Sequence, residues 1–308
     1  MMDLWSVIKL DLAIVNALQR AAILANRMKK IVIRLFLLGC AALALSGAAS
    51  AQNQSQDADD EPDFIVPARP TVSNPAEFQR PGVLQLEYGY NANFHAPGTR
   101  IEQDTPLALR FAASRRLLLE FDADSPISQT PDEGARVTGA GDFQLGVQGV
   151  LQHETESRPG VAFAYYIKLP AASASKGLGT GRVDHNFLAL VSKNVRGTTI
   201  DFNAVYLLAG MTSAAGHASS GQAALAASRN LTRRFGVQAE VSGFSRNDEQ
   251  PGAMFGLGVV TLQVNRRLVF DSGVRFGLTE DAPRVGAVAG LTVGIADLYK
   301  KHGGRGQR

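Results

Sequence analysis

The chain has 308 residues, of which 45% are hydrophobic and 19% are charged, and its formal net charge is only +3. This apolar content is too low for a bundle of membrane helices and ample for one large folded unit. The basic residues are spread over predicted turns and the two ends, which argues against a nucleic-acid-binding surface. The 31 glycines and the single cysteine, Cys40, suit a strand-rich chain with many turns and no disulfide.

Residues 28–51 have the composition of a secretory signal peptide. Two lysines follow Met28, an apolar run covers residues 31–45, and Ala49 and Ala51 form a small-residue cleavage pattern. Lipidation at Cys40 is the alternative, but the residues after Cys40 stay apolar, whereas a lipoprotein becomes polar directly after its cysteine. Residues 1–27 precede the natural start at Met28 and are interpreted as an upstream extension.

Residues 52–80 are polar and acidic at first and then rich in proline. Such a composition offers few side chains for a core, so we predict a disordered periplasmic lead-in. A solvated charge run is favoured over a calcium site for its acidic residues. At the other end of the chain, residues 300–308 form a basic tail. Tyr299, just before that tail, is a candidate for the aromatic residue that ends many outer-membrane barrels.

Residues 81–299 contain about twelve segments with the two-residue alternation of β-strands and no sustained helical period. These segments cover approximately residues 83–94, 105–114, 117–124, 141–152, 161–169, 183–195, 198–208, 221–232, 235–245, 253–264, 268–278 and 285–296. The connections are mostly long after odd-numbered segments and short after even-numbered ones, with residues 153–160 as the exception. The sequence therefore predicts an all-β fold, an up-and-down antiparallel transmembrane β-barrel of about 12 strands with extracellular loops and periplasmic turns.

Short motifs in the middle of the chain carry a resemblance to a known family. Residues 141–146 are Gly-Asp-Phe-Gln-Leu-Gly, a later strand ends at residues 168–170 with Lys-Leu-Pro, and residues 177–181 are Gly-Leu-Gly-Thr-Gly, followed by Asp184. This order resembles the bacterial outer-membrane barrel family named after a meta-pathway of phenol degradation. The resemblance is best over residues 139–192 and extends loosely from about 80 to 296. It implies a presumed transporter of small, hydrophobic or aromatic compounds and brings no catalytic or binding residues.

Each predicted strand has an apolar face and a polar face. Phe235 and Val237 alternate with Gln238 and Glu240, and the strand that contains Phe270 shows the same pattern. A soluble sandwich would bury the apolar faces against each other, whereas a membrane barrel turns them outward. The signal peptide, the loop asymmetry and the strand length favour the barrel, because strands of ~10 residues tilted at ~45° span a bilayer.

The charged residues of the polar faces are then expected to line the lumen. They are Glu87, Arg110, Glu120, Asp122, Asp142, Lys168, Asp201, Glu240, Asp271 and Arg275. Opposite charges on neighbouring strands could pair into a structural network that fills a narrow lumen. They could also define a polar transport pathway. We favour the structural network, and a barrel of this size leaves room for a small solute at most.

His217 and Ser219 are the only candidates for catalysis. They share a strand face, and residues 217–221 resemble a motif of the outer-membrane phospholipases. Ser220 stands where that family has asparagine, and no polar side chain on the neighbouring outward faces could orient the histidine. The remaining histidines lack the spacing of metal ligands. We therefore expect no enzyme, no metal site and no cofactor.

The predicted function is an outer-membrane channel for passive uptake or efflux of small, hydrophobic or aromatic compounds. Two alternatives stay open at this point, namely a lipid-acting enzyme that uses His217 and Ser219 and a structural barrel with a plugged lumen. The expected partners are outer-membrane lipid, a small-molecule solute and the barrel-assembly machinery, without nucleic acid. The location is the bacterial outer membrane, and the sequence leaves the oligomeric state open.

Overall fold

The structure is a computed structural model that describes residues 63–212, 216–247 and 250–299. The predicted upstream extension, the signal peptide with Cys40, residues 52–62 and the basic tail lie outside the described residues. No helix of the described part is long and apolar enough to cross a membrane.

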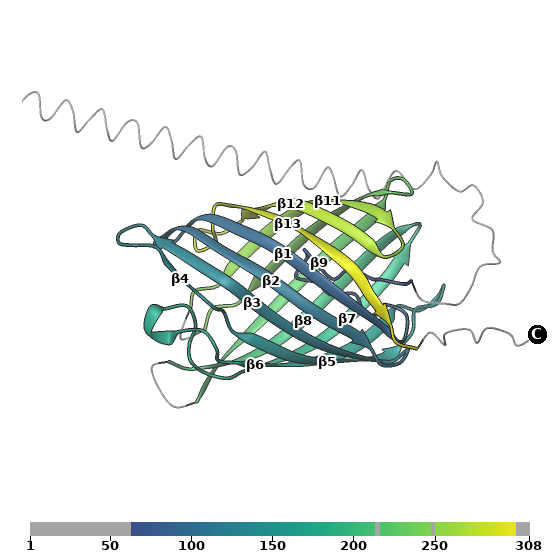
Figure 1. The fold of residues 1–308 in the computed structure, drawn as a ribbon, viewed down its shortest axis with the longest axis horizontal. Helices are drawn as coiled ribbons and strands as arrows, with labels where there is room; N and C mark the ends of the chain where they lie inside the picture. The colour runs from purple at the N-terminus through teal and green to yellow at the C-terminus, as the bar shows by residue number, and fades with distance from the viewer. Residues whose placement is uncertain (1–62, 213–215, 248–249, 300–308) are drawn as a thin grey trace, which may run out of the picture. The chain divides into compact units, whose positions relative to one another are not determined.

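β-Strands make up most of the described chain (Figure 1). They are β1 (Val83–Ala96), β2 (Thr99–Ala112), β3 (Leu117–Pro131), β4 (Val137–Gly139), β5 (Phe143–Gln152), β6 (Gly160–Leu169), β7 (Asp184–Val195), β8 (Thr198–Gly210), β9 (His217–Asn230), β10 (Phe235–Phe244), β11 (Ala253–Asn265), β12 (Leu268–Gly277) and β13 (Val285–Asp297). A short 3-10 helix, η2 (Ala174–Lys176), lies in the connection between β6 and β7.

The strands close into one antiparallel barrel. Each barrel strand pairs with the strand before it in sequence, and β1 pairs with β13 to close the circle. The short β4 pairs only with β3, beyond the end of the β3–β5 ladder, so the closed barrel has 12 strands. Closure leaves no sheet edge unpaired, which a barrel in lipid requires. The predicted all-β, up-and-down barrel is confirmed.

The connections differ from the prediction at two places. Residues 95–104 were expected to form a long loop, but β1 and β2 continue through this region and join at a tight turn that contains Gly98, which has a φ of 72°. The predicted loop 125–140 likewise contains the end of β3 and the short β4. Both extensions carry polar side chains on both faces, so they lack the apolar alternation on which the prediction relied.

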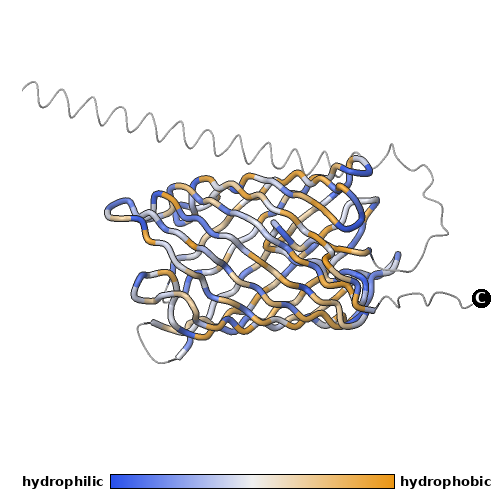
Figure 2. Tube along the Cα trace, in the orientation of Figure 1, coloured by the Kyte–Doolittle hydropathy of each residue, from blue (hydrophilic) through white to orange (hydrophobic). Residues whose placement is uncertain are grey.

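The outer surface of the barrel is apolar. Large hydrophobic side chains on alternate strand positions are exposed, among them Phe235 (55%), Val260 (59%), Phe270 (42%) and Leu225 (52%). Inward-facing residues of the same strands, such as Glu240 on β10 and Asp271 on β12, are buried. Figure 2 shows the resulting alternation of hydrophobic and hydrophilic residues along the strands. The apolar faces therefore meet the membrane and do not pack on each other in a core.

Residues 63–82, which we call the lumenal segment, lie inside the barrel. The main chain of this segment hydrogen bonds to inward-facing side chains of β1, β8 and β10, for example from Val66 to Gln85 and from Ser73 to Glu240. The prediction of a disordered lead-in is therefore wrong for residues 63–80. The backbone groups of the segment are satisfied by side chains of the barrel and not by a helix or a sheet. The segment therefore has no sequence periodicity from which its ordered structure could be predicted.

Candidate functional site

The lumenal segment makes almost a full turn around the inside of the barrel. From Val66 to Gln79 it contacts β1, then β13 and β12, β10, β8, β7 and β5, and finally β2. This order follows the order of the strands in the sheet. The segment therefore binds most of the barrel wall and narrows the lumen at the level of these contacts.

Two glutamates hold the first half of the segment through backbone N–H groups. Glu87 on β1 accepts hydrogen bonds from the N–H groups of Ala68 and Arg69 at 2.9 and 3.0 Å. Glu240 on β10 accepts hydrogen bonds from the N–H groups of Val72 and Ser73 at 3.1 and 2.7 Å, and from the Ser73 hydroxyl at 2.8 Å. Hydrogen bonds to a charged acceptor are stronger than neutral ones, so both glutamates are firm anchors of the segment.

Arg69 fixes the segment to β12 and β13, on the other side of the β1–β13 seam from Glu87. Its guanidinium donates from Nε and Nη2 to the Asp271 carboxylate on β12, at 3.1 and 3.3 Å, and from Nη2 to the Ala289 carbonyl on β13 at 3.0 Å. Gly89 and Gly290 are partners in the β1–β13 ladder, and a Cβ at either position would lie within 2.5 Å of the Arg69 side chain. The two glycines therefore leave the space that the Arg69 guanidinium occupies.

Neutral side chains hold residues 74–76 of the segment. Asn203 on β8 accepts from the Asn74 N–H at 2.7 Å and donates to the Asn74 carbonyl at 2.8 Å. Ser192 on β7 accepts from the Ala76 N–H at 2.8 Å, and Gln148 on β5 donates to the Ala76 carbonyl at 3.0 Å. Each of these contacts involves the main chain of the segment, so the barrel recognises its backbone more than its side chains.

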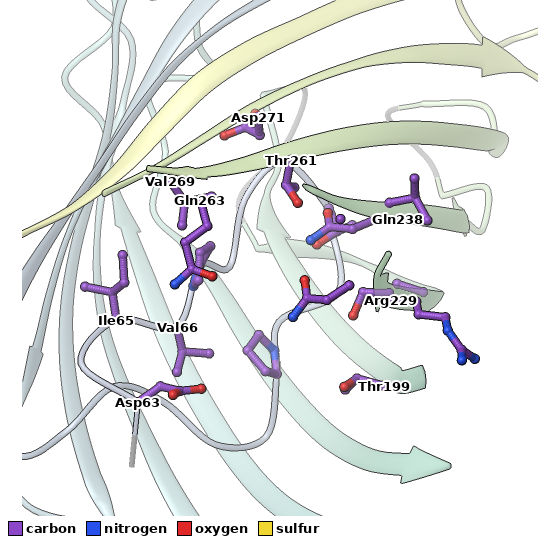
Figure 3. A pocket seen from close by; sticks show the side chains of 18 of the residues that line it. Asp63, Ile65, Val66, Thr199, Arg229, Gln238, Thr261, Gln263, Val269 and Asp271 are labelled. Carbon is purple, nitrogen blue, oxygen red and sulfur yellow. The ribbon is translucent and has the colours of Figure 1, made fainter. Parts of the chain in front are cut away.

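The segment separates two cavities of the lumen. The periplasmic cavity has a volume of about 450 Å³ and is shown in Figure 3, where Asp63, Ile65 and Val66 of the segment face strand residues such as Thr199 and Gln263. The outer cavity has a volume of about 340 Å³. Arg69 and Thr71 line both cavities. A solute that crosses the barrel must therefore pass the segment.

The acidic wall of the outer cavity contains a fully buried arginine at its base. Arg110 on β2 forms ion pairs with Glu87 on β1 and with Glu120 on β3, with N···O distances of 3.3 and 3.4 Å. Tyr166 on β6 donates its hydroxyl to Glu120 at 3.2 Å. The Tyr166 ring reaches across β5 because Gly146 has no side chain, and a Cβ there would lie 2.3 Å from the ring.

The wall of the outer cavity on β7 and β8 is partly apolar, with Asn186 as its polar member. Leu188 and Val205 line it, and Leu188 belongs to a buried cluster with Ala162, Ala164 and Tyr166. Inward apolar side chains of this size are unusual in a lumen that is otherwise polar. The sequence analysis did not identify them, because β7 is apolar on both faces and alternation could not assign its sides.

A third group of charges lies at the outer end of the barrel. Lys168 donates to Asp142 at 3.0 Å and to Asp184 at 2.8 Å. Asp142, which lies between β4 and β5, also accepts the N–H groups of Ala171 and Ala172, both at 2.9 Å. Burial acts to raise the pKa of Asp142, but the hydrogen bonds from Ala172 and Lys168 outweigh it and hold the pKa below its ordinary value. This group ties the β6–β7 connection to the barrel.

The predicted lumen residues thus fall into separate places. Glu87, Arg110, Glu120 and Asp122 are brought together at the outer cavity, and Glu240 and Asp271 hold the lumenal segment. Of the remaining four, Asp142 and Lys168 are at the outer end, and Arg275 lies on β12. Asp201 accepts a hydrogen bond at 2.5 Å from the Ser192 hydroxyl, which in turn holds the segment at Ala76.

His217 and Ser219 lie at the start of β9 and are both exposed on its outward face. The His217 ring lies 5.5 Å from that of His185, which accepts or donates a hydrogen bond at 2.8 Å with the Tyr165 hydroxyl. Among the hydrogen bonds of the described residues, none joins Ser219 to His217. The arrangement therefore does not favour the lipid-acting alternative.

Tyr299 lies two residues beyond β13. Its hydroxyl donates to the Ala113 carbonyl at 3.1 Å, and its ring packs edge-on against Phe111. It therefore closes the seam between the end of the last strand and the β2–β3 turn at the periplasmic end.

A family model described as "Putative MetA-pathway of phenol degradation" matches residues 68–294. No curated protein matches the sequence. The matched range includes most of the lumenal segment and all but the last residues of β13.

Solved structures share the barrel. The crystal structure of an outer membrane channel from Pseudomonas putida F1 is similar with a TM-score of 0.58 and 12% sequence identity, covering 74% of this chain and 99% of that chain. The NanC porin is similar with a TM-score of 0.48 and 8% identity, over 68% and 98% of the two chains. The CymD monoaromatic hydrocarbon channel is similar with a TM-score of 0.42 and 11% identity, over 69% and 87%. At 12% identity, the first likeness is one of fold, and a closed barrel with an apolar outer surface belongs in the bacterial outer membrane.

Proposed function

We propose that this chain, which belongs to the family described as the putative MetA-pathway of phenol degradation, is a passive outer-membrane channel for small, hydrophobic or aromatic compounds. The observation that carries the proposal is the pair of cavities inside a closed barrel, one on each side of the lumenal segment. A barrel whose lumen served only as a packed core would leave no such space.

The dimensions support a small solute. Cavities of about 340 and 450 Å³ lie at the lower end of the range for small-molecule sites. Leu188 and Val205 give the outer cavity an apolar wall on which a hydrocarbon ring can pack. The likeness of fold to an outer membrane channel supports the same conclusion.

A liposome-swelling assay with the purified full-length protein tests the channel. Small polar sugars and amino acids are the right probes, because aromatic compounds cross a bilayer without help. We expect a pentose or glycine to enter faster than into protein-free liposomes, while a trisaccharide is excluded by the lumenal segment. A folded barrel, identified by its heat-dependent mobility on gels, that admits none of these solutes would contradict the proposal.

A further inference from the structure

We propose that the periplasmic edge of strands β7 to β10 binds the phosphate headgroup of an anionic phospholipid from the inner leaflet of the outer membrane. The site consists of three arginines, Arg196, Arg229 and Arg233, next to exposed apolar side chains. It lies on the outside of the barrel, so the inference is independent of the proposed channel.

Arg229 lies on the lipid-facing side of β9, one residue before the strand ends. Its ladder partners are Thr198 on β8 and Val237 on β10. These partners lie two positions from the exposed residues Ile200 and Phe235, so all of them share the outward face. The Arg229 guanidinium donates from Nη1 to the Thr198 hydroxyl at 3.2 Å. Figure 3 shows its side chain pointing away from the periplasmic cavity.

Two exposed arginines lie in the turns on either side of Arg229. Arg196 is in the turn between β7 and β8, whose second strand begins at Thr198, and Arg233 is in the turn between β9 and β10. Because β8, β9 and β10 are neighbours in the sheet, the topology brings three guanidinium groups to one stretch of the edge. A guanidinium binds phosphate through two parallel hydrogen bonds, so this stretch is suited to a phosphate group.

The segments around the arginines contain no carboxylate that could pair with them. No aspartate or glutamate occurs in residues 193–200 or 225–239. The next acidic residues, Asp201 and Glu240, are buried on the inward faces of β8 and β10. This stretch of the edge therefore carries net positive charge on the side that faces the membrane.

Other connections of the barrel carry both signs of charge. Glu154, in the connection between β5 and β6, forms an ion pair with Lys193 at 2.8 Å. At the outer end, the connection between β12 and β13 contains Glu280, Asp281 and Arg284. An excess of cations is therefore not a general property of the connections.

The apolar side chains beside the arginines favour a lipid over a soluble anion. Leu231 (59% exposed) and Phe235 (55% exposed) flank Arg233, and the exposed Val195 directly precedes Arg196. A phospholipid whose phosphate meets the guanidinium groups places its acyl chains against such side chains. A zwitterionic lipid would also bring its own cation to the arginines, so an anionic headgroup is preferred.

Native mass spectrometry of the folded full-length barrel in an uncharged detergent tests the site. Dioleoyl phosphatidylglycerol is the probe, and dioleoyl phosphatidylcholine has the same chains with a zwitterionic headgroup. We expect tighter binding of phosphatidylglycerol. Arg229→Gln should weaken that binding by about fivefold, which corresponds to about 1 kcal/mol, and should leave phosphatidylcholine unaffected. The matched control is Arg284→Gln, exposed at the outer end, which should bind as the wild type does.

Three results would overturn the inference. The first is equal binding of the two lipids to the folded wild-type barrel. The second is an unchanged affinity for phosphatidylglycerol in Arg229→Gln. If that variant does not fold, the double variant Arg196→Gln/Arg233→Gln takes its place, because both side chains are exposed in turns. The third is displacement of the lipid by an equal concentration of glycerol 3-phosphate, which would assign the arginines to a soluble anion.

Discussion

Replacing Glu240 by glutamine should release part of the lumenal segment while leaving the barrel intact. The Glu240 side chain is 1% exposed and accepts three hydrogen bonds, two from the N–H groups of Val72 and Ser73 and one from the Ser73 hydroxyl. In Glu240→Gln one carboxylate oxygen becomes an NH₂ group that can only donate. At least one backbone N–H then loses its acceptor.

The expected magnitude follows from the contacts. A hydrogen bond to a charged group contributes about 1.5–3 kcal/mol. Because each 1.4 kcal/mol is a factor of ten, the population in which the segment has left β10 should rise by about ten- to a hundredfold. Local opening of this kind is measured by amide hydrogen exchange. We expect exchange at residues 72 and 73 to accelerate by that factor, and openings of larger conductance to become more frequent in single-channel recordings.

Glu280→Gln is the control for the change of charge, since Glu280 is exposed in the β12–β13 connection. Unchanged exchange at residues 72 and 73 in folded Glu240→Gln would refute the assignment of Glu240 as an anchor. Accelerated exchange with an unchanged current would instead show that the lumenal segment is not the barrier to conduction.

Three further outcomes are expected. Deletion of residues 63–80 should admit a trisaccharide in the swelling assay, and continued exclusion would place the constriction elsewhere. Val260→Arg, at the middle of β11 on the outward face, should destabilise the barrel in lipid vesicles by about 2–4 kcal/mol, measured by urea unfolding, against about 0–1 kcal/mol for Leu231→Arg in a periplasmic turn. Gly146→Val should push the Tyr166 ring off Glu120 and destabilise the fold by about 1–3 kcal/mol. The double variant with Tyr166→Ala should lose less free energy of unfolding than the sum of the two single variants.

The barrel and the inward or outward direction of most side chains could be predicted from the sequence alone. In β10 and β12, residues such as Phe235 and Phe270 alternate with Glu240 and Asp271, and this two-residue period is a local property that a sequence displays directly. The outward aromatic residues and the inward carboxylates therefore lie where alternation placed them. The extensions of β1 and β2 beyond the membrane were not predicted, because both of their faces are polar.

The lumenal segment could not be predicted in the same way. Its order comes from partners such as Asn203 and Glu240, which are separated from it by more than a hundred residues in sequence. Its own composition, rich in proline and poor in core-forming residues, is that of a disordered chain. The apolar wall at Leu188 was missed for a related reason, because which face of β7 turns inward depends on its pairing with β6 and β8.

The path of the lumenal segment has a consequence for the biogenesis of the protein. Its binding partners are distributed over the sheet, from Gln85 on β1 to Asp271 on β12. A partly formed sheet therefore contains only some of them. The segment can therefore dock fully only after the last hairpins have been inserted and the seam has closed. Protection of its amides would therefore distinguish a finished barrel from one whose seam is still open.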